Sequence, residues 1–288
     1  MSIQAPGVPV SEGLARALRR SMTRDELFAG LCFLGCVNGL GGRAIQSIYR
    51  LGWWAALLNS FDTSAIVWFA CCAGLLFILR GKQQQIRSAD LAVAAGSLIL
   101  ITLPTGGGIS WLAVTGLSVY MLLSTGASMS RHRGAVILLV TTVPMLWTGL
   151  AFRFFTNSIL NIDASLVAWV LGTGRLGNTV RFADDSGYMT IWPPCSSLVN
   201  APYALLTWVV IGQMAGRRWG PRGLLWSGGV CAAVIAANVM RLSLMGLGVD
   251  YYAAIHNQWG DAVVNLIALG LAVGISVFGV RRELLSRP

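Results

Sequence analysis

Eight apolar runs separated by short polar segments limit what this chain can fold into. They cover approximately residues 27–40, 63–79, 91–104, 109–125, 134–155, 198–215, 224–247 and 262–280. Most are long enough to cross a hydrocarbon core of about 30 Å as a helix that rises about 1.5 Å per residue. Because lipid offers no hydrogen-bond partners, a spanning segment must satisfy its own backbone, and a helix does this. The pattern predicts an all-α polytopic membrane protein with about eight transmembrane helices.

The composition supports the membrane class and excludes a nucleic-acid partner. Of 288 residues, 55% are hydrophobic and 11% are charged, whereas soluble proteins average about 25% charged residues. The net charge of +10 would suit nucleic acid, but the charges lie in short clusters between the apolar runs. Membrane lipid is therefore the expected partner.

The distribution of Lys and Arg predicts the orientation. With the N-terminus in the cytoplasm, the inner segments hold 15 basic residues and the outer segments hold 5, with Arg241 inside a span. This bias is typical of inner-membrane proteins with the positive loops inside. We expect a cytoplasmic basic segment (1–26), a single transmembrane domain (27–280) and a cytoplasmic basic tail (281–288).

The N-terminal region allows alternatives. Leu14, Leu18 and Met22 recur at helical spacing among arginines, which fits an interfacial helix or, preferably, a simple basic flank of the first span. Phe33-Leu34-Gly35-Cys36 is faintly similar to a lipoprotein cleavage site. Since the apolar run continues past the cysteine, an uncleaved first span is preferred.

The long outer segment before the sixth run has its own pattern. Apolar residues in 166–170 predict a short helix along the interface. Alternating residues in 179–182 and 188–192 predict two strands joined by the turn 184–187. Such an outer β-hairpin, followed by two prolines, would hold Cys195 in a fixed position.

Cys195 differs in location from the other cysteines. Those fall inside predicted spans, where cysteine is usually a small apolar filler, and they are Cys32, Cys36, Cys71, Cys72 and Cys231. No His or carboxylate joins Cys32 and Cys36, so neither a metal nor a cofactor is expected. Cys195 has no exterior partner, which leaves an intermolecular, a reactive or an incidental thiol.

Arg241 is unusual because it lies within a predicted span. Such a charge costs about 3 kcal/mol or more and by default marks a functional cavity, although a side chain near the outer end can snorkel to the interface. Asn238 lies three residues earlier on the same helix face and is placed to hold the guanidinium. The functional interpretation is preferred, because the outer rim holds few basic residues.

His256 is one of two histidines in the chain. The other, His132, lies in the basic cluster 131–133, which a solvated inner loop explains. His256 lies in the outer loop before the last span, on the same side as Cys195 and Arg241. Alone it would be incidental, but three such residues near one depth predict an active site.

A family resemblance follows from these residues. Cys195-Ser196-Ser197-Leu198, Asn238-Val239-Met240-Arg241 and His256-Asn257-Gln258-Trp259-Gly260 resemble the ordered C-S-G, N-x-x-R and H-x-x-x-G motifs of the exosortase/archaeosortase family. The resemblance is best over 164–261. Ser197 departs from it, because the family usually has Gly there.

The resemblance implies a membrane-embedded cysteine transpeptidase. Its substrates would be exported proteins with a C-terminal sorting signal: a short motif of the PEP-CTERM kind, one transmembrane helix and a basic tail. Cys195 would form a thioester at the outer face, His256 would transfer protons, and Arg241 would stabilise the oxyanion or hold the substrate. Ser196, Asn238 and Asp261 are possible supporting residues.

Two other functions remain open from the sequence. In a transport or polymer-export component, Arg241 would bind an anionic substrate and Cys195 would be incidental. A structural membrane subunit would need no chemistry at all. The sequence shows neither paired intramembrane carboxylates nor repeated broken helices, which argues against transport.

Overall fold

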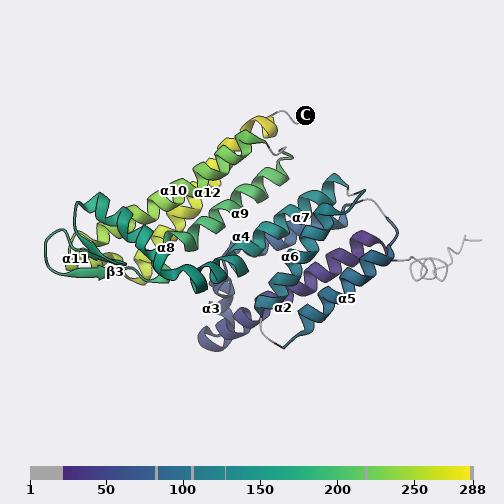
Figure 1. The fold of residues 1–288 in the computed structure, drawn as a ribbon, viewed down its shortest axis with the longest axis horizontal. Helices are drawn as coiled ribbons and strands as arrows, with labels where there is room; N and C mark the ends of the chain where they lie inside the picture. Colours follow the sequence, from purple (N-terminus) through teal and green to yellow (C-terminus); the bar gives the residue numbers. More distant parts are fainter. Residues whose placement is uncertain (1–21, 82–83, 105–106, 127, 218–219, 286–288) are drawn as a thin grey trace, which may run out of the picture.

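The computed structural model describes residues 22–81, 84–104, 107–126, 128–217 and 220–285, which form a helical bundle with a small sheet at one end (Figure 1). The helices are α2 (Arg24–Leu51), α3 (Trp53–Leu58), α4 (Ala65–Leu79), α5 (Ser88–Thr102), α6 (Gly107–Leu123), α7 (Met129–Thr142), α8 (Thr148–Leu171), α9 (Ser197–Met214), α10 (Pro221–Met245), α11 (Val249–Ile255) and α12 (Gln258–Leu285). The strands are β1 (Arg175–Leu176), β2 (Thr179–Arg181) and β3 (Tyr188–Thr190). Three short turns, η1 (Ser60–Asp62), η2 (Val143–Trp147) and η3 (Pro193–Cys195), complete the fold.

All eight predicted apolar runs lie in helices, so the prediction of a mostly helical chain is confirmed. Within the described residues, four helical stretches are long and apolar enough to cross a membrane: Arg24–Leu51, Met129–Leu171, Pro221–Met245 and Ala262–Glu283. Helices α4, α5 and α6 are apolar but shorter. Most of the predicted N-terminal amphipathic stretch, residues 1–21, lies outside the described residues.

The fifth apolar run continues much further than expected. Helix α7 passes through the π-helical turn η2, which contains Pro144, directly into α8. Phe155 bends α8 with φ −127° and ψ 20°, but the helix goes on to Leu171, and Gly172 ends it in the left-handed conformation. Residues 166–170 are helical, as predicted, and the helix that holds them is longer than expected, since it runs from the kink at Phe155 to Leu171.

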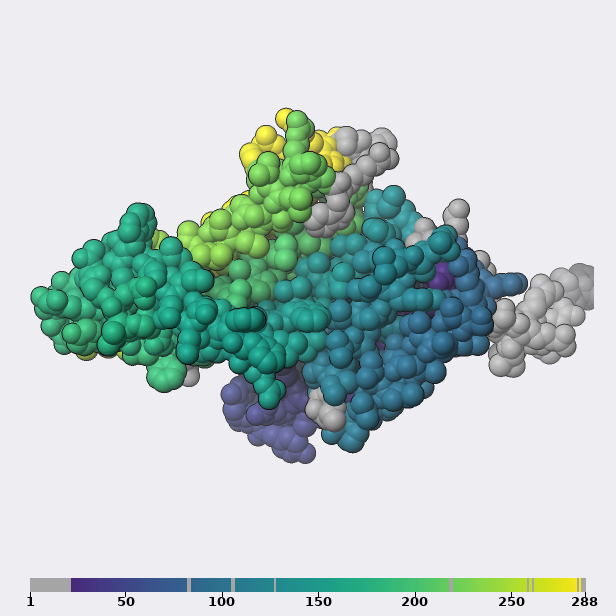
Figure 2. Space-filling view, in the orientation of Figure 1, coloured from purple at the N-terminus to yellow at the C-terminus, as the bar shows by residue number. Residues whose placement is uncertain are grey.

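Two hydrophobic clusters divide the interior. The larger one joins α2, α4, α6, α7 and α9 and includes the buried Phe28, Trp111, Leu138 and Trp208. The smaller one joins α8, α10 and the sheet at the end of the molecule opposite the C-terminus. In the space-filling view this end projects as a lobe of teal and green segments (Figure 2). The smaller cluster carries the residues that the sequence singled out.

The sheet confirms the predicted hairpin. β2 and β3 are antiparallel, with Val180 opposite Met189 on the buried face, and β1, which was not predicted, pairs with β2. In the turn, the hydroxyl and backbone N–H of Ser186 donate to Asp184 and hold the pKa of that carboxyl below its ordinary value. The hairpin is attached to the α10–α11 connection, because Ala183 N–H donates to the carbonyl of Gly246 at 2.9 Å.

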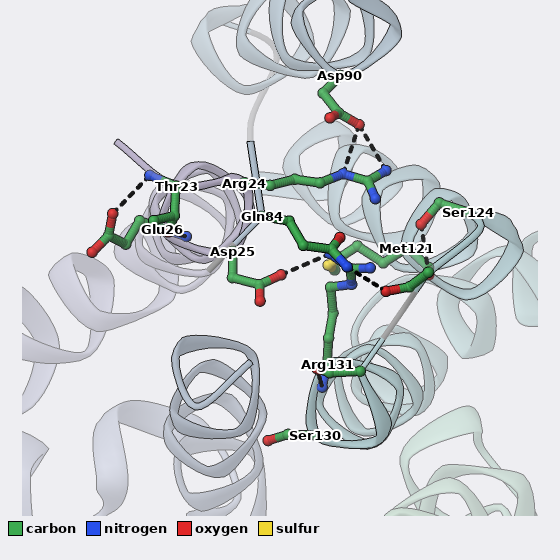
Figure 3. A network of polar contacts seen from close by, with 12 residues as sticks. Thr23, Arg24, Asp25, Glu26, Gln84, Asp90, Met121, Ser124, Ser130 and Arg131 are labelled. Atoms are coloured by element: carbon green, nitrogen blue, oxygen red, sulfur yellow. Dashed lines mark hydrogen bonds and ion pairs between the residues drawn. The ribbon is translucent and has the colours of Figure 1, made fainter. Parts of the chain in front are cut away.

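A buried ionic network joins helices in the N-terminal half (Figure 3). Arg24 at the start of α2 pairs with Asp90 of α5 at 2.8 Å, and Arg131 of α7 pairs with Asp25 at 2.9 Å. All four side chains are at most 4% exposed. Tyr120 of α6 also donates to Asp90. Burial on this scale requires pairing, since an isolated charge would cost far more than an exposed one.

The network corrects the interpretation of residues 131–133 as a solvated loop. His132 is exposed as expected, but Arg131 lies in α7 and is buried. The physical reason is the partner: Asp25 lies 106 residues earlier in the chain and reaches Arg131 only after the helices pack. Charge clustering in sequence therefore did not predict exposure here.

We expect the removal of one partner to destabilise the protein far more at the buried pair than at an exposed one. Arg131→Ala should lower the free energy of unfolding by about 3 kcal/mol or more, because it leaves Asp25 buried without its cation. Arg50→Ala, which breaks the exposed pair with Asp62, should cost about 0.5 kcal/mol. Denaturant unfolding in detergent, followed by tryptophan fluorescence, measures both values. Equal losses in the two variants would contradict the role of the network.

Candidate active site

Cys195 lies at the end of the 3-10 turn η3, between the sheet and α9. Two consecutive prolines before it, Pro193 and Pro194, fix φ in this turn. The N–H of Cys195 donates to the carbonyl of Trp192 at 2.9 Å. The side chain is half-buried and packs against the smaller hydrophobic cluster. The backbone thus presents the thiol from a short, rigid turn.

Asn238 of α10 holds this turn from one side. Its amide nitrogen donates to the carbonyl of Cys195 at 2.8 Å and contacts the hydroxyl oxygen of Ser197 at 3.1 Å. Asn238 is 2% exposed, so these hydrogen bonds form away from water. A buried amide has to be hydrogen-bonded, and here it joins α10 to the residues around the thiol.

Asp163 of α8 holds the same turn from the other side and was missed by the sequence analysis. Its carboxylate accepts a hydrogen bond from the Ser196 hydroxyl at 2.5 Å and one from the Ser197 N–H at 3.2 Å. Asp163 is 4% exposed and Ser196 is fully buried. The residue was placed in an outer segment, where a carboxylate is unremarkable. Asp163 lies in the part of α8 that follows Phe155, and its side chain is buried there against the start of α9.

Helix α9 begins directly after Cys195. Ser196 is its N-cap, and the Ser196 hydroxyl accepts from Leu198 N–H at 3.2 Å. Pro202 lies inside this helix and is buried, so the Leu198 carbonyl lacks the usual backbone donor four residues later. Ser197, where the motif of the resembling family has Gly, has a structural role here, because its hydroxyl oxygen accepts a hydrogen bond from the Asn238 amide.

Arg241 lies on α10 one turn after Asn238, as the sequence predicted, and is half-buried. The helix ends at Met245, which places Arg241 about 6 Å from that end at 1.5 Å per residue. The expectation that Asn238 holds the guanidinium is not met. The Asn238 amide nitrogen is engaged by Cys195 and Ser197, and its oxygen has no hydrogen-bond partner in the described part of the chain.

His256 follows α11 and is exposed. Its ring stacks on Tyr252 with 4.9 Å between ring centroids and an interplanar angle of 27°. Tyr252 in turn packs against Phe182 of the hairpin at 6.4 Å. The His256 ring is thus linked to the smaller hydrophobic cluster through Tyr252 of α11. The side chain of Asp261, the suggested supporting carboxylate, lies outside the described residues.

The structure therefore brings the predicted residues together to different degrees. Asn238 contacts the Cys195 backbone directly, and Arg241 is one turn away on the same helix. His256 belongs to a third element, whose Tyr252 and Ile255 pack against the same hydrophobic cluster as Cys195. Figure 1 shows α11, β3 and part of α8 gathered at this end of the bundle.

A cavity of about 690 Å³ lies beside Pro194, the residue before Cys195, and its described lining includes none of Cys195, Asn238, Arg241 and His256. Helices α3, α4, α9, α10 and α12 and the turn η1 supply most of the rest of the lining. Asp62 and Asn200 make part of the lining polar, while Val234 and Leu269 make part of it apolar. A volume of several hundred Å³ is typical of a site that takes a small ligand or a peptide segment.

The remaining cysteines and the acidic residues form no metal site. All six cysteines are free thiols, and among the residues with described positions no group of three His, Cys, Asp or Glu side chains is placed to bind a metal ion. The described residues at this end of the molecule supply a thiol, a guanidinium, an imidazole, the amide of Asn238 and the carboxylate of Asp163.

Comparisons with known proteins do not identify the chain. No family model, no curated protein and no solved structure matches it. We therefore argue the function from the residues of the site.

Asn238 provides a test of the local geometry that does not depend on function. Asn238→Ala should lower the free energy of unfolding by about 1–3 kcal/mol, because it removes a buried amide that binds both the Cys195 carbonyl and the Ser197 hydroxyl. Met240→Ala, at an exposed position on the same helix, should cost less than about 1 kcal/mol. Thermal unfolding in detergent compares them. If both variants unfold like the wild type, Asn238 does not hold the turn.

Proposed function

We propose that the protein is an exosortase-like cysteine transpeptidase that cleaves a C-terminal sorting signal from exported proteins at the outer face of the cytoplasmic membrane. The observation that carries the proposal is the position of Cys195. It is a half-buried thiol on a rigid turn, one residue after Pro194 at the edge of a cavity, with Asn238 and Arg241 on the adjacent helix. The order of the three sequence motifs supports the same family.

The first half of the reaction forms a thioester. His256 takes the proton of the Cys195 thiol, and the sulfur attacks the carbonyl carbon of the scissile peptide bond. The C–N bond of the tetrahedral intermediate then breaks, and His256 returns the proton to the leaving amine.

The second half releases the product. Water, or an amine on a lipid or polymer, attacks the thioester carbonyl and gives its proton to His256. The C–S bond breaks, and the Cys195 sulfur recovers the proton from the imidazole. Water yields a carboxylic acid, whereas an amine yields a new amide bond, so the acceptor decides between hydrolysis and transpeptidation.

Arg241 has the chemistry to stabilise the negative oxygen of both tetrahedral intermediates. A guanidinium is charged at every relevant pH and presents several N–H donors. In a half-buried position its charge acts through a lower dielectric than water, so its stabilisation of an oxyanion is larger than at an exposed site.

The proposed orientation places both termini in the cytoplasm. Arg217, Arg222, Arg281 and Arg282 lie at the helix ends opposite the sheet, which supports an inner location for that end and an outer one for Cys195. A substrate anchored by one transmembrane helix and an inner basic tail would then present its cleavage motif at the height of the thiol. We propose eight spans in all.

Replacement of Cys195 tests the nucleophile. Cys195→Ala and Cys195→Ser should abolish processing of a sorting-signal protein, because neither supplies a thiolate, and a gel of the substrate in cells measures this. Cys72→Ser, at an exposed cysteine of α4, should process normally. Normal processing in both Cys195 variants would refute the proposed enzyme.

Arg241 tests the transition-state assignment. Arg241→Gln should lower the processing rate about a hundredfold or more, as expected when a donor to an oxyanion is lost. Arg241→Lys should recover only part of the rate, because an ammonium lacks the planar fork of donors. A pulse-chase measurement with a saturating substrate separates slow chemistry from weak binding. Full activity of Arg241→Gln would remove Arg241 from the mechanism.

A further inference from the structure

We propose that Asp163 is a positioning residue for Cys195, because its buried carboxylate fixes the turn from which the thiol projects. This inference builds on the proposed role of Cys195 as the nucleophile. Asp163 belongs to α8 and lies 33 residues before Ser196, so the contact forms only in the folded chain.

The contacts of Asp163 are concentrated on the two residues that follow the thiol. One carboxylate oxygen, Oδ2, accepts both the hydroxyl hydrogen of Ser196 and the N–H of Ser197. The Ser196 contact, at 2.5 Å, is in the range of strong hydrogen bonds to a charged acceptor. A displacement of the carboxylate would therefore move the peptide adjoining Cys195.

The charge of Asp163 is compensated by the start of α9. No cation pairs with Asp163 among the residues that the structure describes. Instead, the carboxylate faces the first N–H of a helix of 18 residues, where the backbone dipole is positive. A carboxylate at this location is stabilised both by the helix dipole and by hydrogen bonds. A neutral side chain would keep the hydrogen bonds but lose the attraction to the dipole.

Ser197 connects Asp163 to Asn238. Ser197 gives its N–H to Asp163, and its hydroxyl oxygen contacts the Asn238 amide, which also binds the Cys195 carbonyl. Helices α8 and α10 thus both hold the residues at the junction of η3 and α9. The nucleophile needs this support, because a displacement of the reacting atom by about 1 Å can lower the reaction rate about a hundredfold.

Three substitutions separate positioning from charge. Asp163→Ala removes both hydrogen bonds. Asp163→Asn keeps an oxygen that accepts both and removes only the charge. Ser196→Ala removes one bond and leaves the carboxylate with Ser197. Ser165→Ala is the matched control. The Ser165 hydroxyl lies on the same helix and donates to the Asn161 carbonyl one turn earlier, away from Ser196 and Ser197.

The experiment measures two quantities on the full-length chain. One is processing of the sorting-signal protein in cells, and the other is the rate at which a maleimide alkylates Cys195 in detergent, followed by peptide mass spectrometry. We expect Asp163→Ala to lower processing by about a hundredfold and to change the alkylation rate by roughly tenfold. Asp163→Asn should restore most of both, Ser196→Ala should be intermediate, and Ser165→Ala should resemble the wild type.

Other results would overturn the inference. Unchanged alkylation in Asp163→Ala shows that the carboxylate does not position the thiol. Equal loss of processing in Asp163→Ala and Asp163→Asn, with normal alkylation in both, assigns Asp163 a role through its charge instead. Alkylation does not require activity, so normal processing by Cys195→Ser together with altered alkylation in Asp163→Ala would reject the enzyme and keep the positioning.

Discussion

A carboxylate removed from water needs a compensating partner, and both ends of this helical bundle are organised by that requirement. In the N-terminal half, Asp25 and Asp90 are neutralised by two arginines, Arg131 and Arg24. At the end with the sheet, Asp163 is compensated by a hydroxyl and by the positive end of a helix. The helices between these points present mainly apolar faces, which pack in many registers at similar cost. The buried polar contacts are what select one register.

The two solutions have different consequences. Two buried ion pairs join helices α2, α5 and α7 through the long side chains of two arginines. This arrangement is suited to holding helices together permanently. The contacts around Asp163 use short side chains and backbone groups, which fix atoms within a smaller volume. A site that performs chemistry requires the second kind of contact, because the position of its reacting atom must be reproducible.

The sequence predicted the helices and the hairpin well because their signals are local. Apolar runs and a turn such as Asp184–Gly187 act within a few residues of the chain. Asp163 and Arg131 were not predicted as buried, because their partners lie 33 and 106 residues away in the chain. Strand β1 has only two residues and no periodicity to detect. Cys195 and Arg241 were expected at a common depth, and Asn238 was expected to hold Arg241. The hydrogen bond of Asn238 to the Cys195 carbonyl instead depends on how α10 is rotated.

Pro202 leaves one gap in the hydrogen-bond ladder of α9, because the Leu198 carbonyl has no backbone donor at residue 202. The segment that carries the thiol into this helix is also held by two other helices, since Asp163 of α8 accepts the Ser197 N–H and Asn238 of α10 donates to the Cys195 carbonyl. The placement of the sulfur therefore depends on how α8 and α10 are positioned, although neither helix carries the cysteine.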